Sequence, residues 1–343
     1  MHPALAIVLA VLLLSSACER GGRPPAESAP ELTWPAPPSR PRIRFVRSVS
    51  GPAELGIRPS FWEQIGGIVA GRDPEVFVRP TGVASRDEVL YVADPGAPAL
   101  WILDARAGRS RRITDVGGQS LVSPVAVALA PGGQVFLADS ALGRVFRLDG
   151  TGRPMAIVTD PGLHRPAGLA YDAARDRLYV ADSAEHRVFV FAGNGQLVAQ
   201  IGQRGTDPGE FNFPTHLAAT PDGSLLVTDA LGYRVQRFAP DGGLLGQFGR
   251  HGDTAGDFAS PKGVALDSEG HIYVVDALFD AIQIFDRSGQ YLLGFGERGI
   301  RRGQFWLPGG LFIDPQDRIY VGDSYNKRVQ VFQYLRGDGD DAG

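Results

Sequence analysis

The stretch PKGVALDSEGHIYVVD, residues 261–276, decides the fold of this chain, because sequences of the same form occur six times. Each copy begins with proline, continues through a short apolar run, a polar turn and a β-branched or aromatic run, and ends in aspartate. The spacings between successive terminal aspartates are 45, 43, 47, 47 and 47 residues. A fixed period in the forties with β-rich units is typical of a β-propeller. The six aspartates are Asp94, Asp139, Asp182, Asp229, Asp276 and Asp323.

Each unit predicts four antiparallel strands. After the aspartate come a loop and an alternating run such as RVFVFA (187–192), and then a fourth run such as YLLGFG (291–296). Four short strands joined by turns make one propeller blade. One blade cannot bury both of its faces, so the units are expected to stack in a ring. We therefore predict an all-β, six-bladed β-propeller over residues 43–335.

The way in which the ring closes is also predicted. The sixth unit ends with RVQVFQYL (328–335) and lacks a fourth strand, whereas IRFVRS (43–48) stands before the first unit as YLLGFG stands before the last. We predict that this N-terminal segment supplies the outer strand of the last blade, which removes an open sheet edge.

An insertion of about twenty residues separates that strand from the first unit. Near residues 54–74, Ser60 and Glu63 have the spacing of a capping box, and apolar residues follow a helical stripe. The sequence predicts a short helix packed on the propeller; the alternative is a docking element for a partner.

The two ends of the chain differ from the repeats. LAIVLAVLLL (5–14), followed by small residues and Cys18, the single cysteine, resembles a bacterial lipoprotein signal. It departs from that pattern in two places: no Lys or Arg precedes the apolar run, and Ser15 stands where leucine is usual. We predict a signal peptide at 1–17 and lipidation of Cys18; an ordinary cleaved signal or an uncleaved anchor is the alternative. Residues 18–42 are polar and proline-rich and predict a tether, and 336–343 form an acidic tail.

The repeats resemble the NHL family. The residues that carry the resemblance are proline with G-V-A, I/L-Y-V-A-D, R-V-Q-V-F, and the G-x-F of Gly209–Phe211, Gly256–Phe258 and Gly303–Phe305. The resemblance covers Pro80 to about Leu335. It implies a binding platform for protein or RNA, although some relatives are enzymes, including a zinc-dependent amidating lyase. A fold of this kind does not by itself fix a function. The lipoprotein-like, tethered arrangement is similar to that of bacterial envelope proteins on the periplasmic or surface side.

The repeat assigns structural roles to most of the charged residues. In four units an arginine stands five positions after the aspartate. A carboxylate that ends one strand and an arginine that begins the next are placed to form an ion pair across the loop. The predicted structural pairs are Asp139–Arg144, Asp182–Arg187, Asp229–Arg234 and Asp323–Arg328.

Two units lack this arginine. Asp94 and Asp276 are followed at that position by Ala99 and Ala281. Either water or backbone N–H groups satisfy the two aspartates, or they are available to a ligand, a cation or a partner. His216 follows its proline by two residues, where it can point into the channel, and two loops after the aspartates carry an aromatic residue. The candidate ligand- or partner-binding residues are Asp94, His216, Asp276, Phe279 and Tyr325.

Several chemistries lack support in the sequence. Of the positions two after each proline only His216 is a histidine, so a histidine-built zinc site is not expected. There is no G-x-S-x-G motif, no legible calcium cage and no glycine-rich phosphate loop. A net charge of -4 gives no basic excess for nucleic acid. We predict no catalytic residue, metal ligand or cofactor and expect an exported platform for an envelope protein or peptide. The alternative, which leaves enzyme activity open, is an envelope lyase or hydrolase that uses a cation in the central channel.

Overall fold

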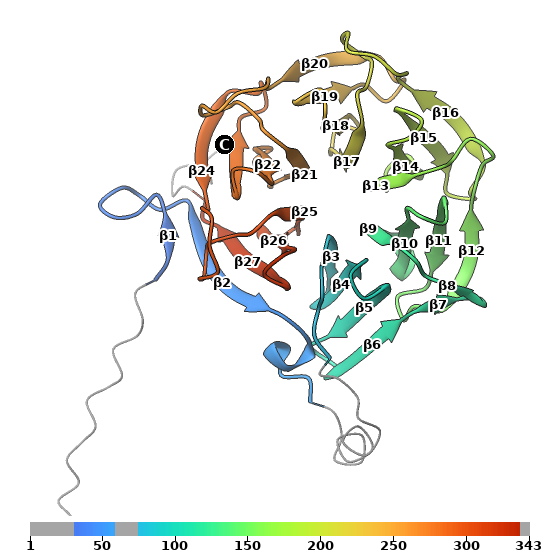
Figure 1. The fold of residues 1–343 in the computed structure, drawn as a ribbon, viewed down its shortest axis with the longest axis horizontal. Coiled ribbons are helices and arrows are strands. Elements are labelled where there is room, and N and C mark those ends of the chain that lie inside the picture. Colours follow the sequence, from blue (N-terminus) through green and yellow to red (C-terminus); the bar gives the residue numbers. More distant parts are fainter. Residues whose placement is uncertain (1–30, 59–74, 337–343) are drawn as a thin grey trace, which may run out of the picture. The chain divides into compact units, whose positions relative to one another are not determined.

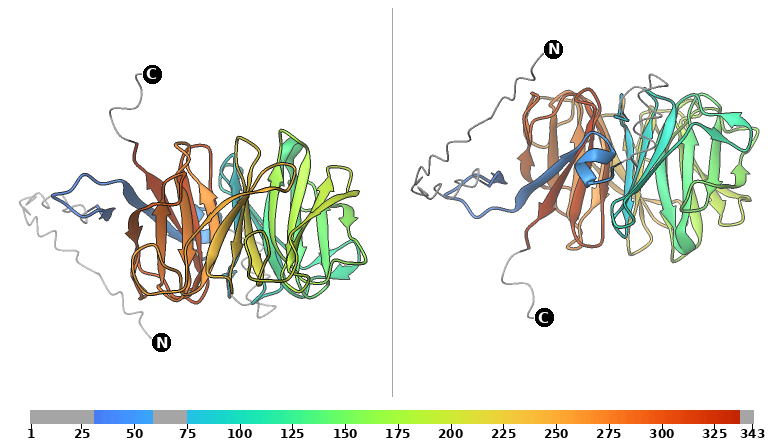
Figure 2. Two further views of the ribbon diagram at one scale, coloured as in Figure 1. Left: turned by 90° about the horizontal axis from the view of Figure 1, so that it is seen from above. Right: turned by 90° about the horizontal axis from the view of Figure 1, so that it is seen from below.

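The computed structural model describes residues 31–58 and 75–336, and the residues from Leu32 onward belong to one compact unit. Six antiparallel sheets surround a central axis, and the first strand of each sheet lies next to that axis (Figure 1). The strands run from one end of the ring to the other (Figure 2). The prediction of an all-β, six-bladed propeller is confirmed. The predicted signal peptide, Cys18, the Ser60–Glu63 capping box and the tail beyond Arg336 lie outside the described residues.

The first three blades each use four consecutive strands, listed from the axis outward. Blade 1 contains β3 (Gly82–Arg86), β4 (Val89–Asp94), β5 (Ala99–Asp104) and β6 (Arg109–Ile113). Blade 2 contains β9 (Pro124–Ala130), β10 (Gln134–Asp139), β11 (Arg144–Leu148) and β12 (Pro154–Val158). Blade 3 contains β13 (Pro166–Asp172), β14 (Arg177–Asp182), β15 (Arg187–Ala192) and β16 (Leu197–Ile201).

The other three blades follow the same order. Blade 4 contains β17 (Pro214–Ala219), β18 (Leu225–Asp229), β19 (Arg234–Phe238) and β20 (Leu244–Phe248). Blade 5 contains β21 (Pro261–Leu266), β22 (Ile272–Asp276), β23 (Ala281–Phe285) and β24 (Tyr291–Phe295). Blade 6 contains β25 (Pro308–Ile313), β26 (Arg318–Asp323), β27 (Arg328–Tyr334) and, from the other end of the chain, β2 (Ile43–Val49).

The N-terminal segment closes the ring as predicted. β2 pairs antiparallel with β27, with Phe45 opposite Phe332 and Val49 opposite Val329. This pairing covers the edge that β27 would otherwise leave open.

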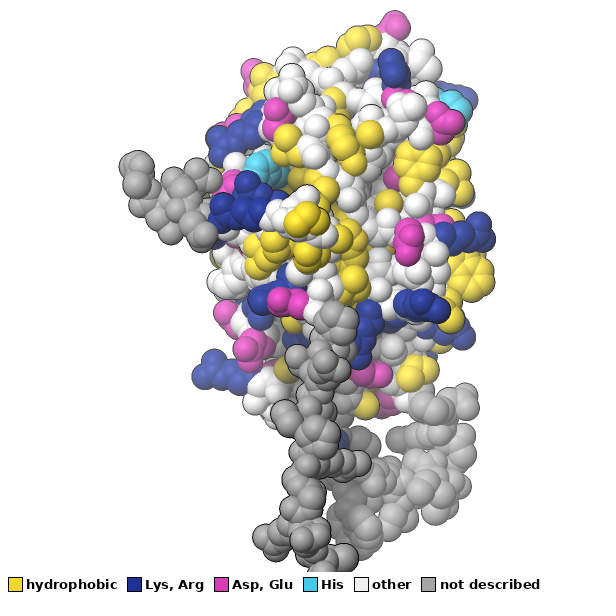
Figure 3. Space-filling model, turned by 90° about the vertical axis from the view of Figure 1, so that its left-hand side faces the viewer, with side chains coloured by type: hydrophobic (Ala, Val, Ile, Leu, Met, Phe, Trp, Pro, Cys, Tyr) yellow, Lys and Arg dark blue, Asp and Glu magenta, His cyan; other side chains and the backbone are white. Residues whose placement is uncertain are grey.

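The sheet then continues beyond the predicted fold boundary. β1 (Thr33–Trp34) pairs with β2, and the Trp34 ring lies 5.6 Å from that of Phe295 and 5.7 Å from that of Phe332. Residues 33–42, which fall in the stretch predicted as a tether, thus turn back on the sixth sheet, where the Trp34 ring packs against two phenylalanine rings. This side of the ring, with β2 and β24, carries hydrophobic side chains at its surface (Figure 3).

The burial of the strands explains their composition. Second strands such as β10 and β14 are buried over nearly their whole length, because neighbouring blades cover both faces. Strands covered on both faces have continuous apolar runs rather than an alternating pattern. Fourth strands such as β12 and β20 are mostly exposed.

The inner strands carry small residues where they approach each other around the axis. A Cβ atom added at Gly168 would lie 2.2 Å from the carbonyl oxygen of Thr215, and one added at Gly310 would lie 2.0 Å from that of Thr81. Glycine is therefore required where adjacent inner strands approach each other. Blade 4 has His216 at the equivalent position, so a bulky polar side chain stands where most blades have none.

Short elements connect the blades. The predicted insertion begins with a 3-10 helix, Pro52–Leu55, and residues 59–74 lie outside the described part of the chain. A small hairpin of β7 (Asp115–Val116) and β8 (Gln119–Ser120) joins blades 1 and 2. Within the described ranges, no helix is long and apolar enough to cross a membrane.

Candidate functional site

The six repeat aspartates are buried at one end of the ring. Each lies at the end of a second strand, and in blades 2–6 it stands opposite the proline that begins the inner strand, as in the pairing of Asp139 with Pro124. We call this end, where the inner strands begin and the second strands finish, the proline face. All six aspartates have an exposed fraction of 0%. Their main role is therefore to organise the loops of the proline face.

Asp94 and Asp276 are satisfied by backbone N–H groups. Asp276 accepts from the amides of Ala259 (2.7 Å), Ser260 (3.0 Å), Leu278 (3.0 Å) and Phe279 (3.2 Å). Asp94 accepts four amides in the same way, from Val78, Arg79, Gly96 and Ala97. The hypothesis that these two carboxylates are available to a ligand is wrong, because burial and four donors leave no approach to them.

Two of the four predicted aspartate–arginine pairs form. Arg234 Nε lies 3.0 Å from Asp229 Oδ2, and Arg328 Nε lies 2.7 Å from Asp323 Oδ2. The other two predictions are wrong. Arg144 donates to Gln119 Oε1, and Arg187 donates to Gln200 Oε1, while backbone amides satisfy Asp139 and Asp182.

A cavity of about 450 Å³ lies at the centre of the proline face, and residues from all six blades line it. We call it the axial cavity. Two of the predicted site residues, His216 and Tyr325, line it, whereas Asp94, Asp276 and Phe279 do not. Phe279 instead contributes its backbone amide to Asp276. Tyr325 is 50% exposed, and its ring lies 5.6 Å from that of Trp306.

Two polar atoms of β17 lack partners at this cavity. Thr215 is 6% exposed, and neither its Oγ1 nor His216 Nδ1 has a hydrogen-bond partner. Burial, together with the nearby charge of Lys262, lowers the pKa of His216 to about 3. The imidazole is therefore neutral near pH 7 and can donate one hydrogen bond and accept another. Unpartnered buried polar groups are rare in folded proteins and call for an explanation.

The axial cavity is also cationic. Arg79, Arg165 and Lys262 line it, and no Asp or Glu is among the described residues that do. Burial lowers the pKa of Lys262, while the charge of Asp276 acts in the opposite direction. Sequence reasoning missed these three cations and Thr215. Their positions in the repeat could have identified them, since each of the four residues is next to the proline that begins a repeat.

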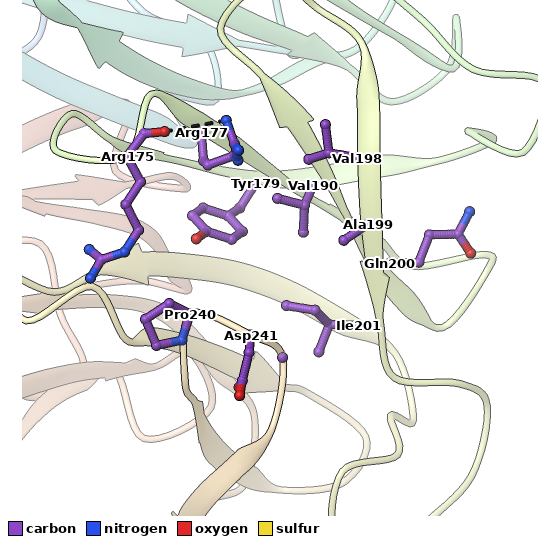
Figure 4. Close-up of a pocket in the computed structure, with 11 residues that line it drawn as sticks. Arg175, Arg177, Tyr179, Val190, Val198, Ala199, Gln200, Ile201, Pro240 and Asp241 are labelled. Atoms are coloured by element: carbon purple, nitrogen blue, oxygen red, sulfur yellow. Dashed lines mark hydrogen bonds between the residues drawn. The ribbon is translucent and has the colours of Figure 1, made fainter.

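A second cavity, of about 450 Å³, lies at the outer rim between blades 3 and 4 (Figure 4). Its polar groups already have local partners. Arg175 pairs with Asp172 at 3.2 Å, Arg177 donates to the Arg175 carbonyl at 3.3 Å, and Asp241 accepts the Gly243 amide at 3.0 Å. The axial cavity is the stronger candidate site, because all six blades line it and no Asp or Glu of the described residues stands beside its three cationic side chains.

Comparison with known proteins agrees with this geometry. A family model described as a 6-bladed beta-propeller matches residues 171–239, and the NHL repeat model matches residues 305–332. No curated protein matches the chain in sequence.

Solved structures with similar folds include several bacterial proteins. A structural genomics protein of unknown function from Bacteroides thetaiotaomicron has a TM-score of 0.62 at 16% identity, covering 77% of this chain and 71% of its own. An auxiliary nutrient binding protein from the same organism has a TM-score of 0.60 at 13% identity, covering 76% and 70%. Virginiamycin B lyase from Staphylococcus aureus has a TM-score of 0.56 at 13% identity, covering 75% and 96%. At these identities the likeness shows the fold alone.

Proposed function

Because the chain is a six-bladed β-propeller with NHL repeats, we propose that it is an exported, lipid-anchored binding protein of the bacterial cell envelope. Its ligand, or a segment of an envelope protein or peptide, enters the axial cavity at the proline face. One observation carries this proposal: all six blades contribute to a cavity that is lined by three cationic side chains, Arg79, Arg165 and Lys262, and by no Asp or Glu of the described residues. A bound molecule with acceptor groups would form charge-assisted hydrogen bonds with these side chains.

Binding accounts for the cavity better than the enzyme alternative does. A lyase or hydrolase that works through a channel cation needs oxygen, nitrogen or sulfur ligands that converge on the ion. The described lining offers one histidine and three cationic side chains, and no group of three or more metal-binding side chains occurs in residues 31–58 and 75–336. This donor set does not fit a cation.

The similar solved structures whose role is named agree with either function, binding protein or enzyme. One is described as an auxiliary nutrient binding protein and another as a lyase, and both share only the fold with this chain. The lining of the axial cavity, which has cationic side chains but no set of metal ligands among the described residues, favours a binding protein.

Crosslinking from the proline face tests the binding role. A photoreactive amino acid in place of Leu278, which is 63% exposed and lines the axial cavity, should capture one defined species in a bacterial host. The same group in place of Gln316, in the turn between β25 and β26 at the other end of the ring, should not. Equal capture from both positions, or none from Leu278, would contradict the proposal.

The anchor is tested separately. Cys18, which follows the apolar run at 5–14, is expected to carry the lipid. Multi-chain acylation holds a protein at a membrane far more firmly than one chain does. Palmitate labelling of the full chain should disappear in Cys18→Ala; label that persists in this variant refutes lipidation at Cys18.

A further inference from the structure

The cations of the axial cavity come from alternate blades. Arg79 precedes the first proline of blade 1, Arg165 precedes that of blade 3, and Lys262 follows that of blade 5. Blades 2, 4 and 6 contribute neutral side chains there, such as Phe213 and Leu307. The ring thus places three positive charges around its axis in a chain whose net charge is -4. Low-dielectric walls around one sign of charge strengthen its field.

These charges have no counter-ion in the described structure. No carboxylate of the described residues lies within 4.0 Å of the side chain of Arg79, Arg165 or Lys262. The nearby aspartates are committed elsewhere, because Asp94 binds the backbone amide of Arg79 and Asp182 binds that of Arg165. Lys262 is partly buried, and burying an unpaired ammonium is unfavourable. The negative charge that acts on Lys262, that of Asp276, is held by backbone amides, and no Asp or Glu is among the described residues that line the cavity.

Hydrogen-bond donors stand beside these charges. His216 lines the cavity, and its neutral imidazole has one N–H to donate. An ammonium and an imidazole N–H at the same cavity can both donate to the oxygen atoms of an anion. Charge-assisted hydrogen bonds of this kind are about twice as strong as neutral ones.

The rim on one side is apolar. Leu278 of blade 5 is 63% exposed, Tyr325 of blade 6 is 50% exposed, and both line the cavity. Exposed apolar side chains next to a polar cavity suit a ligand with an apolar part. Inorganic anions would leave these side chains in water.

We propose that the axial cavity binds a small organic anion, whose carboxylate or phosphate contacts Lys262 and His216 while its apolar part lies against Leu278 and Tyr325. This inference rests on the proposed binding role of the proline face. If the photoreactive group at position 278 captures no species, the binding role is refuted. If small probes bind without a preference for anions, only the proposal that the ligand is an anion is refuted.

Four probes of similar shape test the charge preference: phenylacetate, phenyl phosphate, 2-phenylethanol and phenethylamine. Dissociation constants for the full chain, measured by ligand-observed NMR, should be at least tenfold lower for one of the two anions than for the alcohol or the amine. The anion with the lower dissociation constant shows whether the cavity prefers a carboxylate or a phosphate. Equal affinities for anion and alcohol, or tighter binding of the amine, overturn the proposal.

Variants locate the binding site. Lys262→Met keeps the apolar stem of the side chain and should weaken binding of the preferred anion at least tenfold. His216→Phe keeps a ring of similar size without the N–H and should weaken it severalfold, which keeps the test decisive if Lys262→Met does not fold. The control is Lys327→Gln, because Lys327 is the other lysine of the chain and is exposed outside the cavity lining. Unchanged anion binding in both cavity variants, or equal loss in the control, places the anion elsewhere and overturns the proposal.

Discussion

Blades 1–3 and blades 4–6 fill the space next to the preceding blade in two different ways. In blades 1–3, the third residue of the third strand is a buried aromatic residue: Trp101, Phe146 or Phe189. In blades 4–6, the same register position holds a buried glutamine: Gln236, Gln283 or Gln330. An amide is therefore buried at a site that three other blades keep apolar.

The connecting loop explains the difference. Each glutamine binds the G-x-F loop that precedes its blade: Gln283 accepts the Gly256 amide at 2.9 Å and donates to the Asp257 carbonyl at 2.7 Å. The loop in turn supplies the aromatic ring, since Phe211, Phe258 and Phe305 are each 0% exposed and pack between neighbouring blades. The aromatic side chain thus moves from the strand to the loop, and the glutamine holds the loop in place.

The same loop decides which arginines pair with aspartate. Arg234 bonds Asp229 and also donates to the carbonyls of Asp207 and Glu210 in the loop before blade 4. Arg328 does the same with the loop before blade 6. Blades 2 and 3 have no such loop, so Arg144 and Arg187 lack these carbonyls and turn to glutamine side chains.

The largest effect is expected from removing a loop-bound arginine. Arg234→Ala removes the charged partner of Asp229, a fully buried carboxyl whose pKa burial already raises, and leaves it with backbone donors such as Asn212. The variant should lower the free energy of unfolding by about 3–5 kcal/mol. Arg144→Ala, in a blade without the loop, should change it by less than about 1 kcal/mol. Urea denaturation measures both. Equal losses in the two variants would mean that the loop is not what distinguishes the blades.

These differences separate the features that can be predicted from the sequence from those that cannot. The period of the aspartates predicts the ring, its blade number and its closure, because each depends only on strand pattern and spacing. The partners of Arg144 and Arg187 depend on the absence of a G-x-F loop before blades 2 and 3. Comparing the aspartate and arginine positions alone does not reveal that absence. The axial cavity depends on side chains from six distant segments, so Lys262 and Thr215 become neighbours of His216 only once the ring is closed. A rule that required both G-x-F and arginine would have separated Arg234 and Arg328 from the others.

The glutamines give the next largest effect. Gln283→Leu keeps the volume of the side chain but leaves the Gly256 amide and the Asp257 carbonyl without their partner, and should cost about 2 kcal/mol of unfolding free energy. Gln290→Leu, at an exposed position of the same blade, should stay within about 0.5 kcal/mol. Denaturation of the two variants measures the difference. If Gln283→Leu is as stable as Gln290→Leu, the glutamine does not hold the loop.

His216 predicts a pH dependence. Its pKa is lowered to about 3 in the folded state, so between pH 6.5 and 3 the unfolded chain binds a proton that the folded chain does not. Stability should therefore fall as the pH drops through this window. In His216→Asn this part of the loss should vanish, which makes the variant relatively more stable at pH 4 than at pH 7, by about 3 kcal/mol. Denaturation of both proteins at the two pH values measures it; parallel losses would show that His216 does not resist protonation.

His271, in the β21–β22 turn of blade 5, should show the opposite and smaller dependence. Its Nδ1 lies 2.8 Å from Asp267 Oδ2, and this hydrogen bond raises the pKa of His271 above 6.5. A raised histidine pKa contributes stability that is present below pH 6.5 and is lost as the pH rises through the folded-state value. His271→Gln should thus be less stable than the wild type by about 0.5–1 kcal/mol at pH 6, and the gap should close by pH 9. A gap that stays constant between these two pH values would assign the loss to packing against Tyr334, whose ring lies 5.7 Å away, rather than to the charge.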